Sequence, residues 1–126
     1  MHTKIMIIDA HPVYVLKTVG FLESLTLKDN VVVARGQLAM EAVSEHKPDV
    51  IVLSATLPDA DSVELARQIK SLYPAVAMIV QIGLLASAQL EGAFKSVGVD
   101  YTVPRLEKDW SAFQYVLTDI LSAKST

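Results

Sequence analysis

The sequence predicts an α/β fold in which helices cover both faces of one parallel sheet. Short continuous apolar runs alternate with longer segments whose apolar residues recur at helical spacing. The apolar runs do not alternate between apolar and polar residues, as strands with one solvent-exposed face do. Continuous apolar runs are typical of strands that are buried on both faces. Five such pairs follow one another without a repeat or an internal linker, so we expect a single domain over residues 1–126.

The first half of the chain supplies two strand–helix pairs and a third strand. The expected strands are "KIMII" (Lys4–Ile8), "VVVA" (Val31–Ala34) and "DVIVL" (Asp49–Leu53). Pro12 is a favoured first helical residue. After it, apolar residues recur at helical spacing at Val13, Leu16, Val19, Leu22 and Leu25. A second, shorter helix is expected at Gln37–His46, stopped by Pro48.

The second half continues the alternation. Apolar residues indicate a third helix, at Val63, Leu65, Ala66, Ile69 and Leu72. Strands are expected at Val76–Ile82 and Asp100–Val103, and the helix between them ends at Gly98, a common C-terminal cap. The last helix is expected from about Glu107 to Ser122. Its inner face would carry Trp110, Phe113, Leu117, Ile120 and Leu121.

Composition and charge exclude several classes of function. The net charge is −3 and the isoelectric point about 5.5, which gives no electrostatic footprint for nucleic acid or an anionic membrane. The chain has no cysteine, so it has neither disulfides nor thiolate metal sites. No signal peptide or membrane-length apolar window is visible, so we expect a cytoplasmic protein. Its mean hydropathy of +0.38 is high, which a two-sided sheet core and an apolar partner surface would explain.

The handedness of crossover connections leaves few topologies, and the flavodoxin-like strand order 2-1-3-4-5 is the natural one. In such a three-layer (βα)5 sandwich, the functional crevice lies at the carboxyl ends of the first and third strands. Here we expect Asp9, Ala10 and His11 to line it from one side and Ser54 from the other.

Three fragments resemble the receiver domain of bacterial response regulators. They are "IMIIDAHPV", "DVIVLSATLPDADSVELARQI" and "FKSVGVDYTVPR", and they occur in the family's order and spacing over essentially the whole chain. The resemblance implies a domain that transfers a phosphoryl group onto its own aspartate, with Mg²⁺ held by oxygen ligands. "DAHPV" is similar to a subgroup with a C-terminal helix-turn-helix, so this domain could be the N-terminal part of a longer regulator.

Residue by residue, the chain departs from the family's reaction centre. The first acidic position is Asp9, but the second is Ala10 and the phosphoacceptor position is Ser54. The hydroxyl position is Ile82 and the lysine position is Arg105, so one of the five catalytic positions keeps its residue type. The switch aromatic of the fifth strand is replaced by Thr102. The resemblance therefore predicts an intact scaffold with a degenerate phosphorylation pocket.

Each of these residues allows a functional and a structural interpretation. Ser54 could be a nucleophile only with His11 as its base, and no third group clearly orients that histidine. We favour a serine that fills space and bonds to the loop backbone. Asp9 alone offers few oxygen ligands for Mg²⁺, and we favour its pairing with Arg105 or with helix amides. The three histidines have no metal-ligand spacing, so no metal and no cofactor are expected.

A candidate interaction surface follows from the last helices. Leu84 and Leu85 stand in a loop that is usually polar in the family; they could cap the crevice or contact a partner, and the sequence leaves both open. Together with Phe94, Tyr101 and Tyr115, they mark the face of the fourth helix, fifth strand and fifth helix. Family members commonly use this face for dimerisation and output.

These observations favour a pseudo-receiver that signals or regulates transcription through protein partners or self-association, independently of aspartyl phosphorylation. It would not be an enzyme, and this domain would contact neither membrane nor nucleic acid directly. A second hypothesis is a regulatory domain that binds a small molecule in the vacated crevice. A hydrolase based on Ser54 ranks last.

Overall fold

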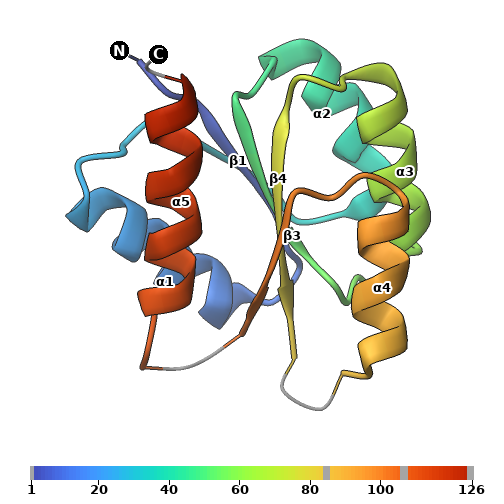
Figure 1. The fold of residues 1–126 in the computed structure, drawn as a ribbon. Helices are drawn as coiled ribbons and strands as arrows, with labels where there is room; N and C mark the ends of the chain where they lie inside the picture. Colours follow the sequence, from blue (N-terminus) through green and yellow to red (C-terminus); the bar gives the residue numbers. More distant parts are fainter. Residues whose placement is uncertain (1, 84–85, 106–107, 125–126) are drawn as a thin grey trace.

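The computed structural model describes residues 2–83, 86–105 and 108–124 and contains one five-stranded sheet between two layers of helices (Figure 1). The strand order is β2-β1-β3-β4-β5, and every neighbouring pair is parallel. The predicted α/β class and the flavodoxin-like strand order are therefore confirmed. Among the described residues, none of the helices combines the length and the apolar composition that a membrane crossing needs.

The strands lie within a residue or two of the predicted runs. They are β1 (Ile5–Ile8), β2 (Asn30–Val33), β3 (Val50–Ser54), β4 (Ala77–Ile82) and β5 (Tyr101–Pro104). The helices are α1 (Pro12–Ser24), α2 (Ala39–His46), α3 (Ser62–Leu72), α4 (Ala88–Ser96) and α5 (Ser111–Lys124), and a 3-10 turn at Gly36–Leu38 precedes α2. All residues of β1 and β3 are buried, as two-sided coverage requires.

Helices α1 and α5 cover one face of the sheet, and α2, α3 and α4 cover the other (Figure 1). Because side chains alternate along a strand, each strand feeds two separate cores. Ile5 and Ile7 pack with Phe113 and Leu117 on the α1–α5 side. Met6 and Ile8 pack with α2, α3 and α4 on the other side.

Helix α1 is correctly predicted, but its burial differs from a simple apolar stripe. Val13 and Leu16 satisfy the helical spacing, yet they are 51% and 73% exposed. Thr18 and Leu22 are the fully buried residues of this helix. A helix that is apolar nearly all round gives a clear helical signal but does not indicate which face is buried.

Helix α5 begins at Ser111, later than the predicted start near Glu107, which lies outside the described residues. The reason lies in Asp109, whose Oδ1 accepts hydrogen bonds from the Ser111 N–H at 3.0 Å and the Ser111 hydroxyl at 2.6 Å. This short polar turn satisfies the first free backbone donor of the helix, as an N-terminal cap does. The predicted inner face is largely correct, because Phe113, Leu117 and Ile120 are buried.

Candidate functional site at the carboxyl ends of the strands

Parallel strands bring three polar residues to one edge of the sheet. Asp9 follows β1, Ser54 ends β3, and Arg105 follows β5. The backbone N–H of Arg105 donates to the carbonyl of Ile82 at 2.8 Å, which ties the chain after β5 to the end of β4. The side chain of Arg105 reaches back across the sheet from this point to β3 and β1.

The guanidinium of Arg105 occupies the crevice between these strand ends. Its Nη2 donates to Asp9 Oδ2 in an ion pair, and its Nη1 donates to Ser54 Oγ at 3.2 Å. The Asp9 side chain is 1% exposed and that of Arg105 is 13% exposed. A carboxylate so deeply buried needs a partner, and the guanidinium supplies it. The Asp9–Arg105 pairing favoured from the sequence is therefore present.

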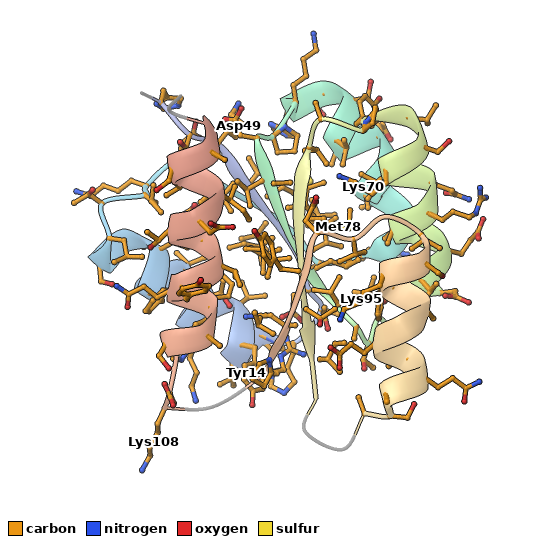
Figure 2. All side chains as sticks on the ribbon, viewed as in Figure 1. Tyr14, Asp49, Lys70, Met78, Lys95 and Lys108 are labelled. Carbon is orange, nitrogen blue, oxygen red and sulfur yellow. The ribbon has the colours of Figure 1, made fainter. Side chains whose placement is uncertain are left out.

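Tyr14 covers the outer side of the guanidinium. The Arg105 Cζ atom lies 4.1 Å from the centre of the Tyr14 ring, a cation–π contact. Figure 2 shows Tyr14 on α1 at the end of the sheet nearest Lys108. The Nε of Arg105 is buried and makes no hydrogen bond within the described part of the chain. The arginine is thus held on several sides, and its charge stays inside the protein.

The residues at this edge do not fit the Mg²⁺ that the family resemblance implies. Asp9 is the lone carboxylate of the set, since Ala10 and Ser54 stand at the other acidic positions. Asp9 Oδ2 is paired with a guanidinium, and Oδ1 accepts the His11 N–H at 2.9 Å. A hard divalent cation requires several oxygen ligands and would meet a fixed positive charge here. This set of side chains therefore does not form a site for Mg²⁺.

Ser54 bonds to the loop that follows it, as the structural interpretation predicts. Its hydroxyl donates to the Thr56 carbonyl at 2.9 Å and accepts from the Thr56 N–H at 3.2 Å. His11 caps helix α1 instead of serving as a base, because its Nδ1 accepts the Tyr14 N–H at 3.4 Å. Among the hydrogen bonds of the described residues, none joins Ser54 to His11. The geometry gives no support to a serine nucleophile.

Two neighbours on β4 complete the edge. Ile82 is 8% exposed and packs into the core on the α2–α4 side, so it fills space as expected. Gln81 was not singled out from the sequence. It pairs in register with Ser54, is 3% exposed, and lies with Arg105 and Trp110 around a cavity of about 10 Å³. A lone amide within the apolar run "VAMIVQI" is the signal that could have identified it.

The candidate interaction surface is changed by the structure. Phe94 was expected to contribute to it, but this ring is fully buried and packs in the α2–α4 core. It faces inward because burial of the apolar ring against the sheet stabilises the packing of α4, whose buried residue it is. Leu84 and Leu85, which were also expected to contribute, lie outside the described residues. Tyr115 is 74% exposed, so it keeps its place on the outer face of α5.

Tyr101 and Thr102 lie on opposite sides of β5. The Tyr101 hydroxyl donates to Asp119 of α5, and this bond to a carboxylate raises the pKa of the phenol. Thr102 Oγ1 donates to Glu91 of α4 at 3.2 Å. Beside Thr102 there is a hollow of about 220 Å³ between α4 and β5, also lined by Ile82 and Ala86. Thr102 stands at the position of the family's switch aromatic, and its small side chain leaves space that an aromatic ring would fill.

Comparisons with known proteins agree with this architecture. A family model described as the response regulator receiver domain matches residues 5–109. An uncharacterised response regulatory protein of Vibrio cholerae is 32% identical over 71 residues, which is 56% of this chain and 26% of that protein. The chain therefore spans about a quarter of the length of the curated relative that it matches.

Solved structures show the same fold at low sequence identity. A two-component response regulator from Clostridium difficile has a TM-score of 0.88 and 21% identity, over 98% of this chain and 99% of that chain. The BeF3-activated N-terminal receiver domain of RstA from Klebsiella pneumoniae has a TM-score of 0.82 and 20% identity, over 93% and 97%. At such identities the likeness concerns the fold.

Proposed function

Because the chain belongs to the response regulator receiver domain family, we propose that it is a pseudo-receiver of two-component signalling. It keeps the family's shape and signals or regulates transcription through protein contacts, independently of aspartyl phosphorylation. In this role it is a binding module of the cytoplasm and not an enzyme. The match covers only about a quarter of the curated relative. We therefore propose in addition that the domain works together with an output region.

The Arg105 bridge carries the proposal. Phosphoryl transfer onto a receiver requires a carboxylate nucleophile, a cation held by carboxylates, and free donors for the phosphoryl oxygens. Here a serine stands at the acceptor position, and an arginine already occupies the carboxylate that would hold the cation. Its Nη1 and Nη2 groups already donate to Ser54 and Asp9 before any phosphoryl group arrives. Because the Arg105 guanidinium is a cation that belongs to the protein itself, it supports a phosphorylation pocket that is held in one conformational state.

The same bridge argues against a ligand in the vacated crevice. The small cavity that borders the bridge is lined by Arg105, Gln81 and Trp110, without Asp9 or Ser54, and measures about 10 Å³, which is room for a single water molecule. Small-molecule sites are usually at least about thirty times larger. Ile82 presents a branched alkyl group at this edge, which offers no hydrogen bond to a polar ligand. We therefore retain protein contact as the proposed activity of this domain.

Beryllofluoride with Mg²⁺ tests the proposal, because it mimics an aspartyl phosphate. The amide NMR spectrum of the chain should not change when both are added. A matched positive control restores the four altered positions together, as Ala10→Asp, Ser54→Asp, Ile82→Thr and Arg105→Lys. The restored variant should show shifts around residues 9 and 54. Shifts in the unmodified chain at those residues would contradict phosphorylation independence.

A separate experiment addresses the contact surface. We propose that α4, β5 and α5 contact a protein partner or a second copy of the chain, with exposed Tyr115 as an anchor. Tyr115→Ala should weaken self-association in sedimentation velocity or the retention of a cognate partner. Leu16→Ala is the matched control, because Leu16 has similar exposure (73%) on α1. Equal effects of the two variants would contradict this choice of surface.

A further inference from the structure

Strand β2 is an edge of the sheet and pairs only with β1 within the described part of the chain. The Ile5 N–H donates to the Asp29 carbonyl at 3.0 Å, and the Asp9 N–H donates to the Val33 carbonyl at 3.1 Å. The odd-numbered residues of this segment therefore face β1. Along a strand, the residues between them direct their backbone groups the other way, out of the sheet. The outward groups belong to Asn30, Val32 and Ala34.

Most of these outward groups have no partner. Among the hydrogen bonds of the described residues, none involves the Val32 N–H, the Val32 carbonyl, the Ala34 N–H or the Asn30 carbonyl. The Asn30 N–H is the exception, because it donates to the Lys28 carbonyl at 3.1 Å. A strand edge with free donors and acceptors is a template for a further strand.

Strand β2 lacks the features by which proteins usually protect such an edge. The segment "NVVVA" (residues 30–34) contains neither a charged residue nor a proline. Its register with β1 is continuous, without a bulge. The Val32 side chain, which lies on the same face as its register partner Ile7, is 44% exposed. An uncharged edge with an exposed β-branched residue is suited to pairing with another extended segment.

Opposite charges flank this segment at its two ends. Asp29 precedes it and Arg35 follows it. The backbone of Arg35 is extended, with φ −128° and ψ 126°, and its side chain is exposed. Within the described residues, the Arg35 guanidinium forms no hydrogen bond and no ion pair. The Asp29 carboxylate contacts His2, whose side chain is 77% exposed. Arg35 is thus a free cation at one end of the edge, and the carboxylate of Asp29 stands at the other.

This charge pattern is complementary to itself. In an antiparallel pair with Val32 opposite Val32 of a second copy, Asp29 lies opposite Arg35 of that copy, and Arg35 lies opposite its Asp29. The neighbouring registers that use the same outward backbone groups would place Val33 or Gln37 opposite Asp29 instead. The charges therefore select both the occupant of the edge and its register.

We propose that β2 pairs with β2 of a second copy of this chain, antiparallel, about a two-fold axis at Val32. The Val32 N–H donates to the Val32 carbonyl of the second copy, and the Ala34 N–H donates to the Asn30 carbonyl of the second copy, each in both directions. The groups that are free in one chain are those that the other requires, and the exposed Val32 side chains contact each other. Strand β5, at the opposite edge, stays available for the contact of α4, β5 and α5.

Sedimentation velocity of the 126-residue chain, from about 1 μM to about 1 mM, should show a dimer that forms with increasing concentration. Val32→Lys should abolish it, because two ammonium groups would then meet at the axis. Leu72→Lys is the matched control, since Leu72 is 66% exposed on α3, and should leave the dimer unchanged. Circular dichroism verifies that both variants fold. A chain that stays monomeric up to about 1 mM, or equal effects of the two substitutions, would overturn the proposal.

Mixing two charge variants tests the register. Asp29→Arg and Arg35→Asp should each raise the dissociation constant of the dimer at least about tenfold, because each places like charges opposite one another on both sides of the axis. An equimolar mixture of the two variants should dimerise again, since both cross-strand pairs then join opposite charges. A folding defect in either variant would not be repaired by mixing. Absence of this rescue would overturn the assignment of the charge pairs.

NMR on a mixture of labelled and unlabelled chains separates this dimer from one that forms through α4, β5 and α5. An intermolecular contact is expected between the Val31 Hα and the Val33 Hα of the second copy, which are close in an antiparallel pair of this register. Tyr115→Ala should keep this contact and Val32→Lys should remove it. Retention of the contact in Val32→Lys, or its loss in Tyr115→Ala, would overturn the pairing of β2 with its copy.

Discussion

The guanidinium carbon of Arg105 lies 4.1 Å from the centre of the Tyr14 ring. Because the same guanidinium pairs with Asp9 and bonds to Ser54, it joins four parts of the fold: the ends of β1, β3 and β5 and the start of α1. Tyr14 excludes water from one side of the charge, which strengthens the ion pair. The degenerate pocket is therefore a cross-linked polar cluster, and its removal should be measurable as stability.

We expect Arg105→Ala to destabilise the domain strongly. The substitution leaves the Asp9 carboxylate, which is 1% exposed, without its cation. Loss of one partner of a buried pair costs about 3–5 kcal/mol. Arg105→Lys keeps a cation but loses the planar contact with Tyr14 and the second donor, so it should cost about 1–2 kcal/mol. Urea unfolding followed by circular dichroism measures both free energies of unfolding.

Asp9→Asn provides the control for this prediction. If the cost of Arg105→Ala comes from an unpaired carboxylate, it should become much smaller in the Asp9→Asn background. An undiminished cost would assign the effect to the packing of the arginine stem on Tyr14 instead. A loss below about 1 kcal/mol for Arg105→Ala alone would show that water readily reaches Asp9.

Ser54→Ala should have a modest effect. The hydroxyl of Ser54, a residue that is 1% exposed, bonds to Thr56 and to Arg105, and these are neutral or singly charged hydrogen bonds. Their loss should lower the free energy of unfolding by about 1 kcal/mol and leave partner binding intact. Chemical denaturation gives the first quantity and a binding assay with the cognate partner the second. A large loss of binding at unchanged stability would show that the hydroxyl itself acts in function.

The fold could be predicted from the sequence because its strongest signals are local. The segments "IMII" and "VIVL" are apolar at every position, as is typical of strands in a sheet covered on both faces. Strand order followed from crossover handedness, which leaves few arrangements. The start of α5 was misplaced because the deciding feature is one side chain, Asp109, bonding to Ser111. Such a turn competes with helix over a few residues and carries no periodic signal.

The site could be predicted only in part. The Asp9–Arg105 pair followed from charge, since a buried acid requires a nearby base. The contact of Arg105 with Tyr14 did not, because it depends on the rotation of α1, which the apolar residues of that helix leave ambiguous. Phe94 was assigned to the surface for a similar reason. The topology indicates which helices and strand form the face that partners often use, but the burial of Phe94 depends on the direction of its side chain.

Gly36 should not tolerate alanine. A Cβ at this residue would stand 2.5 Å from the Ala60 Cβ, and that neighbour is a short side chain on a fixed loop. Gly36→Ala should therefore cost about 1–3 kcal/mol of unfolding free energy. Gly20→Ala is the matched control within α1, where nothing lies within 4 Å, and should stabilise the domain by about 0.5–1 kcal/mol. Thermal denaturation distinguishes the two; equal melting temperatures would contradict the close approach.

The contact between Gly36 and the loop that carries Asp59 should be sensitive to acid. Its carboxylate accepts the Gly36 N–H at 2.9 Å and the Gln37 N–H at 3.1 Å, and these amides, Gln37 first, lower the pKa of Asp59 below 3.8. Since the folded pKa is the lower one, the stabilisation is complete above pH 3.8 and is lost as the pH falls through the folded pKa. An NMR titration of the Asp59 carboxyl carbon should give a midpoint below 3.8, and the Gly36 and Gln37 amide protons should shift with that midpoint. In Asp59→Asn both amide transitions should disappear; their persistence would assign them to another acid.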